Sequence, residues 1–139
     1  MNSHLNKVPQ LAIFRSTTAT AANGVVPLVL RGQDATNSHT VSGGVVNLLA
    51  GRTYIISAGL PNDTATVSKS IGIEISTNGG ASWTPIWASS RSGATGGGGV
   101  AAGTTVTDVY TTTVPTKVRV TAGAKGLIDG VWLRCEVIV

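Results

Sequence analysis

The residues that could carry acid–base or metal chemistry are few and widely spaced along the chain. The sequence holds six carboxylates and two histidines, namely Asp34, Asp63, Glu74, Asp108, Asp129, Glu136, His4 and His39. Glycoside hydrolysis needs two facing carboxylates, and a histidine-based metal site needs several ligands close together. The spacing indicates neither arrangement, so we expect no catalytic residue, no metal and no cofactor.

Nucleophilic catalysis is not indicated either. The chain lacks the Gly-x-Ser-x-Gly elbow of the α/β-hydrolases. Cys135 is the single cysteine and lies in an alternating apolar run, which predicts a buried, inert thiol. The glycine-rich stretch 93–103 is followed by no helix and no lysine, both typical of phosphate-binding loops. We therefore expect that the protein is not an enzyme.

The charge content is the most informative bulk property. Charged residues make up 12% of the chain, against about 25% in an average soluble domain. A lone domain with so few charges has weak protection against association, and interface centres are poor in charge. We expect much of the surface to be buried in an assembly. The alternative is a monomer that serine and threonine hydroxyls keep soluble.

The basic residues do not form a cluster. The net charge is +4, but no two of the ten Lys and Arg residues are adjacent, whereas nucleic-acid grooves combine clustered basic residues with aromatics. No run approaches the roughly 18 apolar residues of a membrane helix, and the N-terminus lacks the apolar core of a signal peptide. We expect no nucleic-acid partner, no membrane, and synthesis and folding in the cytoplasm of a cell.

The elements that must position these residues are β-strands. Ile71, Ile73 and Ile75 recur with the strand period of two. Residues 78–80, Asn-Gly-Gly, favour a tight turn, and a second strand is expected over 82–88. The chain is thus organised around a central β-hairpin.

The length of the hairpin loop decides which way two tryptophans point. An odd loop places Trp83 and Trp87 on the isoleucine face, and an even loop places them beside Glu74. We favour a three-residue loop, which buries both indoles. Because Pro85 has no N–H, the second strand is expected at a sheet edge or with a bulge.

The remaining pattern predicts an all-β protein. Further strands are expected over 11–16, 25–31, 40–49 (with a bulge or bend at Gly43-Gly44), 53–60, 105–114, 116–122 and 131–139. The prediction is a jelly-roll-type β-sandwich of about eight antiparallel strands in one domain, residues 11–139, with residues 1–10 as an extended N-terminal arm. An immunoglobulin-like sandwich is the second choice.

The hairpin also matches a known signature. Ser76, Asn78, Gly80 and Trp83 resemble the sialidase-type Asp-box, S-x-D/N-x-G-x-x-W, which is a structural hairpin on propeller blades. The motif occurs once, and 139 residues cannot supply a six-bladed propeller. We interpret it as turn chemistry rather than as a sign of sialidase activity.

Three stretches carry a second resemblance: 40–60, the hairpin 78–83 and the closing strand 131–139. They resemble bacteriophage virion proteins with C1q/TNF-like jelly rolls. The resemblance implies a trimeric jelly roll without catalytic residues, as in capsid decoration (cement) proteins and in fibre or spike tips.

We therefore expect a homotrimer on the capsid exterior that binds the major capsid protein lattice and stabilises the head. The expected partner contacts are Leu5, Lys7, Val8, Pro9, Arg15 and Trp132. One alternative is a receptor- or glycan-binding tip domain, in which Trp83, Trp87, Trp132 or Tyr110 stack on sugars. Another is a minor tail or head-completion component, which its low copy number per virion would distinguish.

Overall fold

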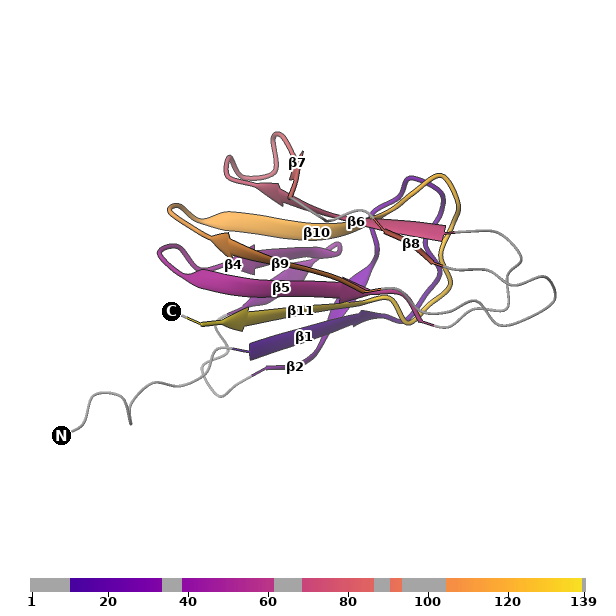
Figure 1. Cartoon of the computed structure of the whole chain (residues 1–139), viewed down its shortest axis with the longest axis horizontal. Helices are drawn as coiled ribbons and strands as arrows, with labels where there is room; N and C mark the ends of the chain where they lie inside the picture. The colour runs from indigo at the N-terminus through magenta and orange to yellow at the C-terminus, as the bar shows by residue number, and fades with distance from the viewer. Residues whose placement is uncertain (1–10, 34–38, 62–68, 87–90, 94–104, 139) are drawn as a thin grey trace.

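The computed structural model describes residues 11–33, 39–61, 69–86, 91–93 and 105–138. These residues form two antiparallel sheets packed face to face, and no helix (Figure 1). No helix capable of spanning a membrane is therefore found in these ranges. The predicted all-β sandwich is confirmed.

The first sheet has the strand order β2-β1-β11-β5-β9. Its strands are β1 (Leu11–Ser16), β2 (Leu28–Gln33), β5 (Thr53–Gly59), β9 (Thr105–Thr111) and β11 (Trp132–Val137). The second sheet has the order β3-β4-β10-β6-β7, and β8 also pairs with β6. Its strands are β3 (Thr40–Ser42), β4 (Val45–Leu48), β6 (Lys69–Ser76), β7 (Thr84–Pro85), β8 (Arg91–Gly93) and β10 (Thr116–Ala122). The described strands outnumber the predicted eight mainly because several of them are only two or three residues long.

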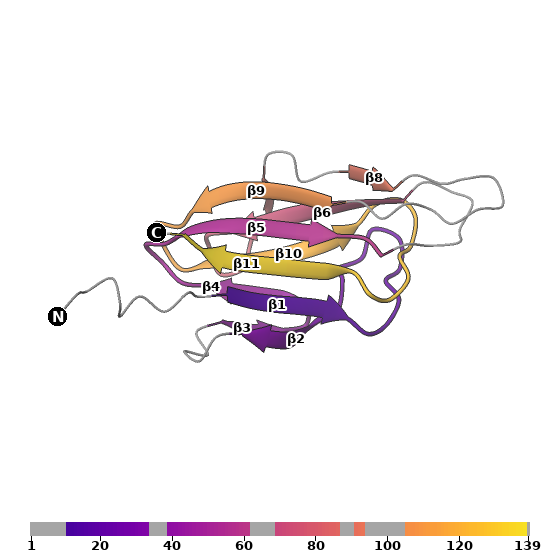
Figure 2. The ribbon, with the colours of Figure 1, turned by 60° about the horizontal axis from the view of Figure 1, so that its bottom comes forward.

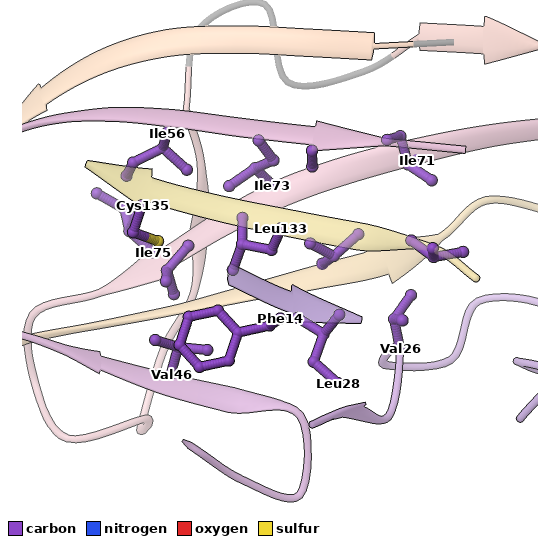
Figure 3. Packing of buried hydrophobic residues seen from close by; sticks show 14 of the residues in the cluster. Phe14, Val26, Leu28, Val46, Ile56, Ile71, Ile73, Ile75, Leu133 and Cys135 are labelled. Carbon is purple, nitrogen blue, oxygen red and sulfur yellow. The ribbon is translucent and has the colours of Figure 1, made fainter. Parts of the chain in front are cut away.

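The core lies between the two sheets. Alternate residues of the longer strands, such as β5, β6 and β10, point inward, as the period-two pattern predicted. Figure 3 shows Phe14, Ile56 and Leu133 of the first sheet meeting Ile73 and Ile75 of the second, all of them buried. Burial on this scale is the main favourable term for the fold.

The closing strand is the central strand of its sheet. β11 pairs with β1 on one side and with β5 on the other, so Cys135 lies opposite both Ala12 and Ile56. Figure 2 shows β1, β11, β5 and β9 side by side in front of the second sheet. The inward face predicted for this strand is confirmed by the complete burial of Leu133 and Cys135.

The predicted register of the central hairpin is wrong. The last registered pair is Ile75 with Thr84, which leaves an even number of residues, 76–83, between the two strands. Trp83 therefore lies on the outward face with Glu74, half-buried, and the Arg119 guanidinium lies 4.1 Å from its ring centroid. The loop is longer than expected because side-chain hydrogen bonds of residues 76–82 build a wide turn. Trp87 lies outside the described residues.

Two other sequence predictions concern turns and edges. Pro85 does lie at a sheet edge, since β7 is the last strand of its sheet. Gly43 and Gly44 form the turn of a tight hairpin between β3 and β4, with φ of 58° and 80°, rather than a bulge within one strand. Positive φ at two successive residues matches the twist of a two-residue hairpin, so the expected single strand 40–49 divides into two.

Candidate binding cleft on the first sheet

The two outward faces of the sandwich differ in chemistry. On the second sheet, Arg119 Nε lies 2.8 Å from Glu74 Oε1, and its guanidinium stacks on Trp83. Lys117 Nζ donates to Asn47 Oδ1 at 2.8 Å. Arg119, Glu74 and Lys117 of this face therefore already have partners within the same sheet.

The first sheet exposes Ile13, Val29 and Leu30 on β1 and β2, and a second group of aliphatic side chains lies near the end of β11. Val109 is 57% exposed and Ile138 is 44% exposed. The register places Val109 beside Ile55, and Ile138 donates its N–H to the Thr53 carbonyl. We call Leu11, Ile55, Val109 and Ile138 the aliphatic band. It lies on the outward face near the end of β11.

Trp132 marks the opposite end of the same face. It begins β11 and pairs with Gly59 of β5 and with Arg15 of β1. Its indole lies directly against Gly59, where an added Cβ would come within 2.4 Å of the ring atoms. A side chain at position 59 would therefore displace the indole. Because residue 59 is glycine, the ring can lie directly against the backbone of β5.

Three arginines surround this indole. Arg15, Arg31 and Arg134, together with Ile13 and Trp132, line a hollow of about 410 Å³. We call it the arginine cleft. The three arginines come from adjacent strands, β1, β2 and β11, and all of them are exposed.

A second hollow adjoins the cleft and shares Arg15 and Arg31 with it. Its volume is about 400 Å³, and its remaining lining residues are Ser16, Thr17, Pro61, Asp129 and Gly130. The combined surface therefore offers guanidinium groups next to an indole ring and, in the second hollow, the exposed residues Thr17 and Asp129, whereas Ser16 is buried and accepts from the Val131 N–H.

The charges of the cleft are only partly neutralised. Arg134 Nη2 lies 2.8 Å from Glu136 Oε2, in an exposed ion pair. The side chains of Arg15 and Arg31 form no ion pair or hydrogen bond with any residue that the structure describes. These two guanidinium groups are free to bind an anion.

Two of the six residues expected to contact a partner lie in this cleft. The structure brings Arg15 and Trp132 together, whereas Leu5, Lys7, Val8 and Pro9 lie outside the described residues. Sequence reasoning missed Arg31 and Arg134. Arg134 follows Trp132 by two residues and shares its face, which is a readable signal. Arg31 belongs to another strand and had no such signal.

The buried polar groups serve the fold rather than a site. Tyr54 Oη accepts a hydrogen bond from the Leu49 N–H at 2.9 Å and lies 3.0 Å from His39 Nε2. Burial raises the pKa of the Cys135 thiol to about 12, which disfavours the reactive thiolate. No group of three or more His, Cys, Asp or Glu side chains suited to a metal occurs among the residues described.

No protein-family model matches the chain, and no characterised protein matches its sequence. Solved structures do match. Murine APRIL at pH 5.0 aligns with a TM-score of 0.71 at 10% identity, over 94% of this chain and 100% of that one. Eiger TNF from S. frugiperda gives 0.72 at 8% identity, over 95% and 94%. The globular domain of zebrafish complement 1qA gives 0.60 at 13% identity, over 96% and 97%. The chain therefore has a TNF/C1q-like jelly-roll fold.

Proposed function

We propose that this chain is a structural virion protein that assembles as a homotrimer through the outward face of its first sheet. It decorates the exterior of a bacteriophage capsid by binding the major capsid protein lattice. The observation that carries the assembly is the difference between the two outward faces. One face exposes the aliphatic band, and the other has charged groups that already have partners.

The aliphatic band is suited to burial against another copy. Val109 and Ile138 each expose about half of their surface, and burying apolar surface contributes about 25 cal/mol per Å². The second sheet gains less from burial, because none of the exposed large aliphatic side chains among the described residues lies on its strands. A trimer formed through the aliphatic band hides these exposed aliphatic side chains and leaves the second sheet in water.

The fold supports the same assembly. The sequence resemblance to C1q/TNF-like jelly rolls implies a trimer, and the likeness to the TNF and C1q structures supports it. Three copies related by a closed rotation bury one patch of each copy against a different patch of its neighbour.

The bulk properties of the chain support the proposed capsid partner. It is short, rich in β-strands and poor in charge, which suits a protein that stays bound to a larger shell. The arm of residues 1–10, with Leu5, Lys7, Val8 and Pro9, would reach a neighbouring capsid subunit. In this proposal the protein has no catalytic activity and is assembled into virions in the host cytoplasm, with no nucleic-acid or membrane partner.

Two measurements test the proposal. Sedimentation velocity of the purified chain should give the mass of a trimer. Mixing the chain with capsids that lack it, followed by pelleting, should bring it down with the capsids in saturable amounts. A solitary monomer at high concentration would overturn the trimer, and a chain that stays in the supernatant would overturn the decoration role.

A second candidate is a receptor- or glycan-binding tip domain of a fibre or spike. The specific observation in its favour is the half-buried Trp132 in a cleft lined by arginines. Loss of glycan-array binding in a Trp132→Ala variant would favour this candidate over the first. An array without any bound glycan would count against it.

A further inference from the structure

We infer that the arginine cleft binds a sugar acid, with its carboxylate on Arg15 and Arg31 and its ring against Trp132. The inference rests on the second candidate function alone. The decoration role does not depend on it, because capsid pelleting and sugar titration measure the binding of different partners.

The carboxylate is assigned to Arg15 and Arg31 because both side chains lack partners among the described residues. They extend from neighbouring strands, and both line the two adjoining hollows. A guanidinium presents donors in a planar fork that matches a carboxylate, and such charge-assisted pairs are stronger than neutral hydrogen bonds.

The ring is assigned to Trp132 because its indole is fixed and partly exposed. The ring is held against Gly59, and its position pairs it with Arg15 on the same face. An aromatic surface next to a few well-placed polar groups is typical of small-molecule sites, and hollows of about 400 Å³ lie in their size range.

Asp129 argues for a sugar acid rather than for phosphate. Asp129 is exposed and lines the second hollow together with Thr17, which is also exposed. A carboxylate accepts hydrogen bonds from sugar hydroxyls, whereas it repels a multiply charged phosphate. The mixture of two free arginines, one hydroxyl residue and one acid therefore suits a ligand that carries one negative charge and several hydroxyls.

Trp132 of the cleft and the exposed side chains of the aliphatic band lie toward opposite ends of the first sheet, and the Arg134–Glu136 ion pair joins the two regions. Trp132 begins β11, and Ile138 follows the end of this strand. Gly59 likewise ends β5, whereas Ile55 lies near its start. A copy packed on the band therefore need not cover the cleft, and one trimer could present three sugar-acid sites.

The test is a titration of the full chain, uniformly labelled with nitrogen-15, followed by NMR. The Trp132 indole N–H signal is assigned by its loss in Trp132→Phe. Glucuronic acid and glucose form a matched pair that differs in the carboxylate, and acetate supplies a carboxylate without a ring. We expect a saturable shift of the Trp132 signal with glucuronic acid or N-acetylneuraminic acid, and weaker responses to glucose, acetate and inorganic phosphate.

Two variants locate the site. Arg31→Gln should weaken sugar-acid binding by about tenfold or more, since a hydrogen bond to a charged group is lost. Arg119→Gln is the control, because it removes an arginine that stacks on a tryptophan of the other sheet, and it should leave the affinity unchanged. Chemical-shift maps of both variants should show an intact fold.

Several results would overturn the inference. One is a Trp132 signal that does not shift with either sugar acid, or that shifts equally with glucose. Another is a shift of this signal with acetate or phosphate that is as strong as with the sugar acids. A third is an unchanged affinity of Arg31→Gln for the sugar acids. A short glutamate-rich peptide that binds more tightly than both sugar acids would also overturn it, because the cleft would then belong to a protein contact.

Discussion

Cys135 and Tyr54 are buried groups that carry no charge at neutral pH, and the fold disfavours their ionised forms. Burial raises the pKa of Cys135 to about 12. The pKa of Tyr54 is also raised, chiefly by burial, although the hydrogen bond from the Leu49 N–H partly opposes the shift. A raised pKa in the folded state means that the unfolded chain loses its proton first as the pH rises. The contribution of these two groups to the free energy of unfolding is therefore fully present at neutral pH and is lost as the pH rises into the alkaline range.

We expect the free energy of unfolding to fall as the pH rises above the ordinary thiol pKa of 9.0. At about pH 11 the loss from Cys135 should reach about 2–3 kcal/mol. Urea unfolding at about pH 8 and about pH 11 measures it. Cys135→Ala should be less stable at about pH 8 because it leaves a cavity, yet its stability should change less with pH. Equal pH dependence in the two proteins would contradict the assignment.

At the scale of elements, the turn between β6 and β7 is closed by its own side chains. Ser76 Oγ accepts from the Gly80 N–H at 2.8 Å, and Asn78 Oδ1 accepts from the Ser82 N–H at 3.0 Å. Asn78 Nδ2 also donates to Ser82 Oγ at 2.7 Å. This is the structural hairpin that the Ser76, Asn78, Gly80 and Trp83 pattern indicated. The turn then sets Trp83 against Arg119.

Asn78→Ala should destabilise the protein by about 1–2 kcal/mol, because it removes both hydrogen bonds to Ser82 and leaves Ser76 without its acceptor. Thermal unfolding followed by circular dichroism measures the change. Thr77→Ala is the control, since Thr77 is an exposed neighbour whose side chain makes no hydrogen bond among the described residues. A shift no larger in Asn78→Ala than in Thr77→Ala would show that the turn does not depend on this network.

The elements also show what sequence alone could predict. The alternation of Leu133 and Cys135 predicted their inward face, because side-chain direction along a strand is a local property. The face of Trp83 depends on the length of a loop, and hydrogen bonds within the loop decided that length. The place of Arg31 beside Arg15 depends on pairing between β1 and β2, whose register shifts between Ile13 and Phe14. A single sequence carries no signal for such a shift.

At the scale of the whole molecule, low charge predicted association but could not say which surface associates. The associating surface can be identified only from the folded sandwich, because it depends on which strands share an outward face. Leu11, Ile55 and Val109 come from three separate strands and meet only through the pairing of β1, β11, β5 and β9. Glu136 of β11 lies between Leu11 and Ile55 in the strand register and forms an ion pair with Arg134. The band therefore has one ion pair at its centre.

Val109→Asp should convert the trimer to a monomer without unfolding the chain. Val109 is 57% exposed in the single copy, so a carboxylate there remains in water, and the cost to the monomer is small. In the trimer the same carboxylate would be buried without a partner, which costs several kcal/mol per copy.

Sedimentation velocity and thermal unfolding at matched concentrations measure both effects. Val114→Asp is the matched control, because it makes the same change at an exposed residue between β9 and β10, off the outward sheet face, and it should remain trimeric. A trimeric Val109→Asp variant would exclude the aliphatic band as the interface. Loss of the trimer in both variants would mean that added negative charge, rather than the band, controls assembly.

Capsid pelleting of the monomeric variant then tests whether decoration requires three linked copies. We expect the affinity of the monomeric variant for capsids to fall steeply, because a single contact lacks the gain in effective concentration that three linked contacts have.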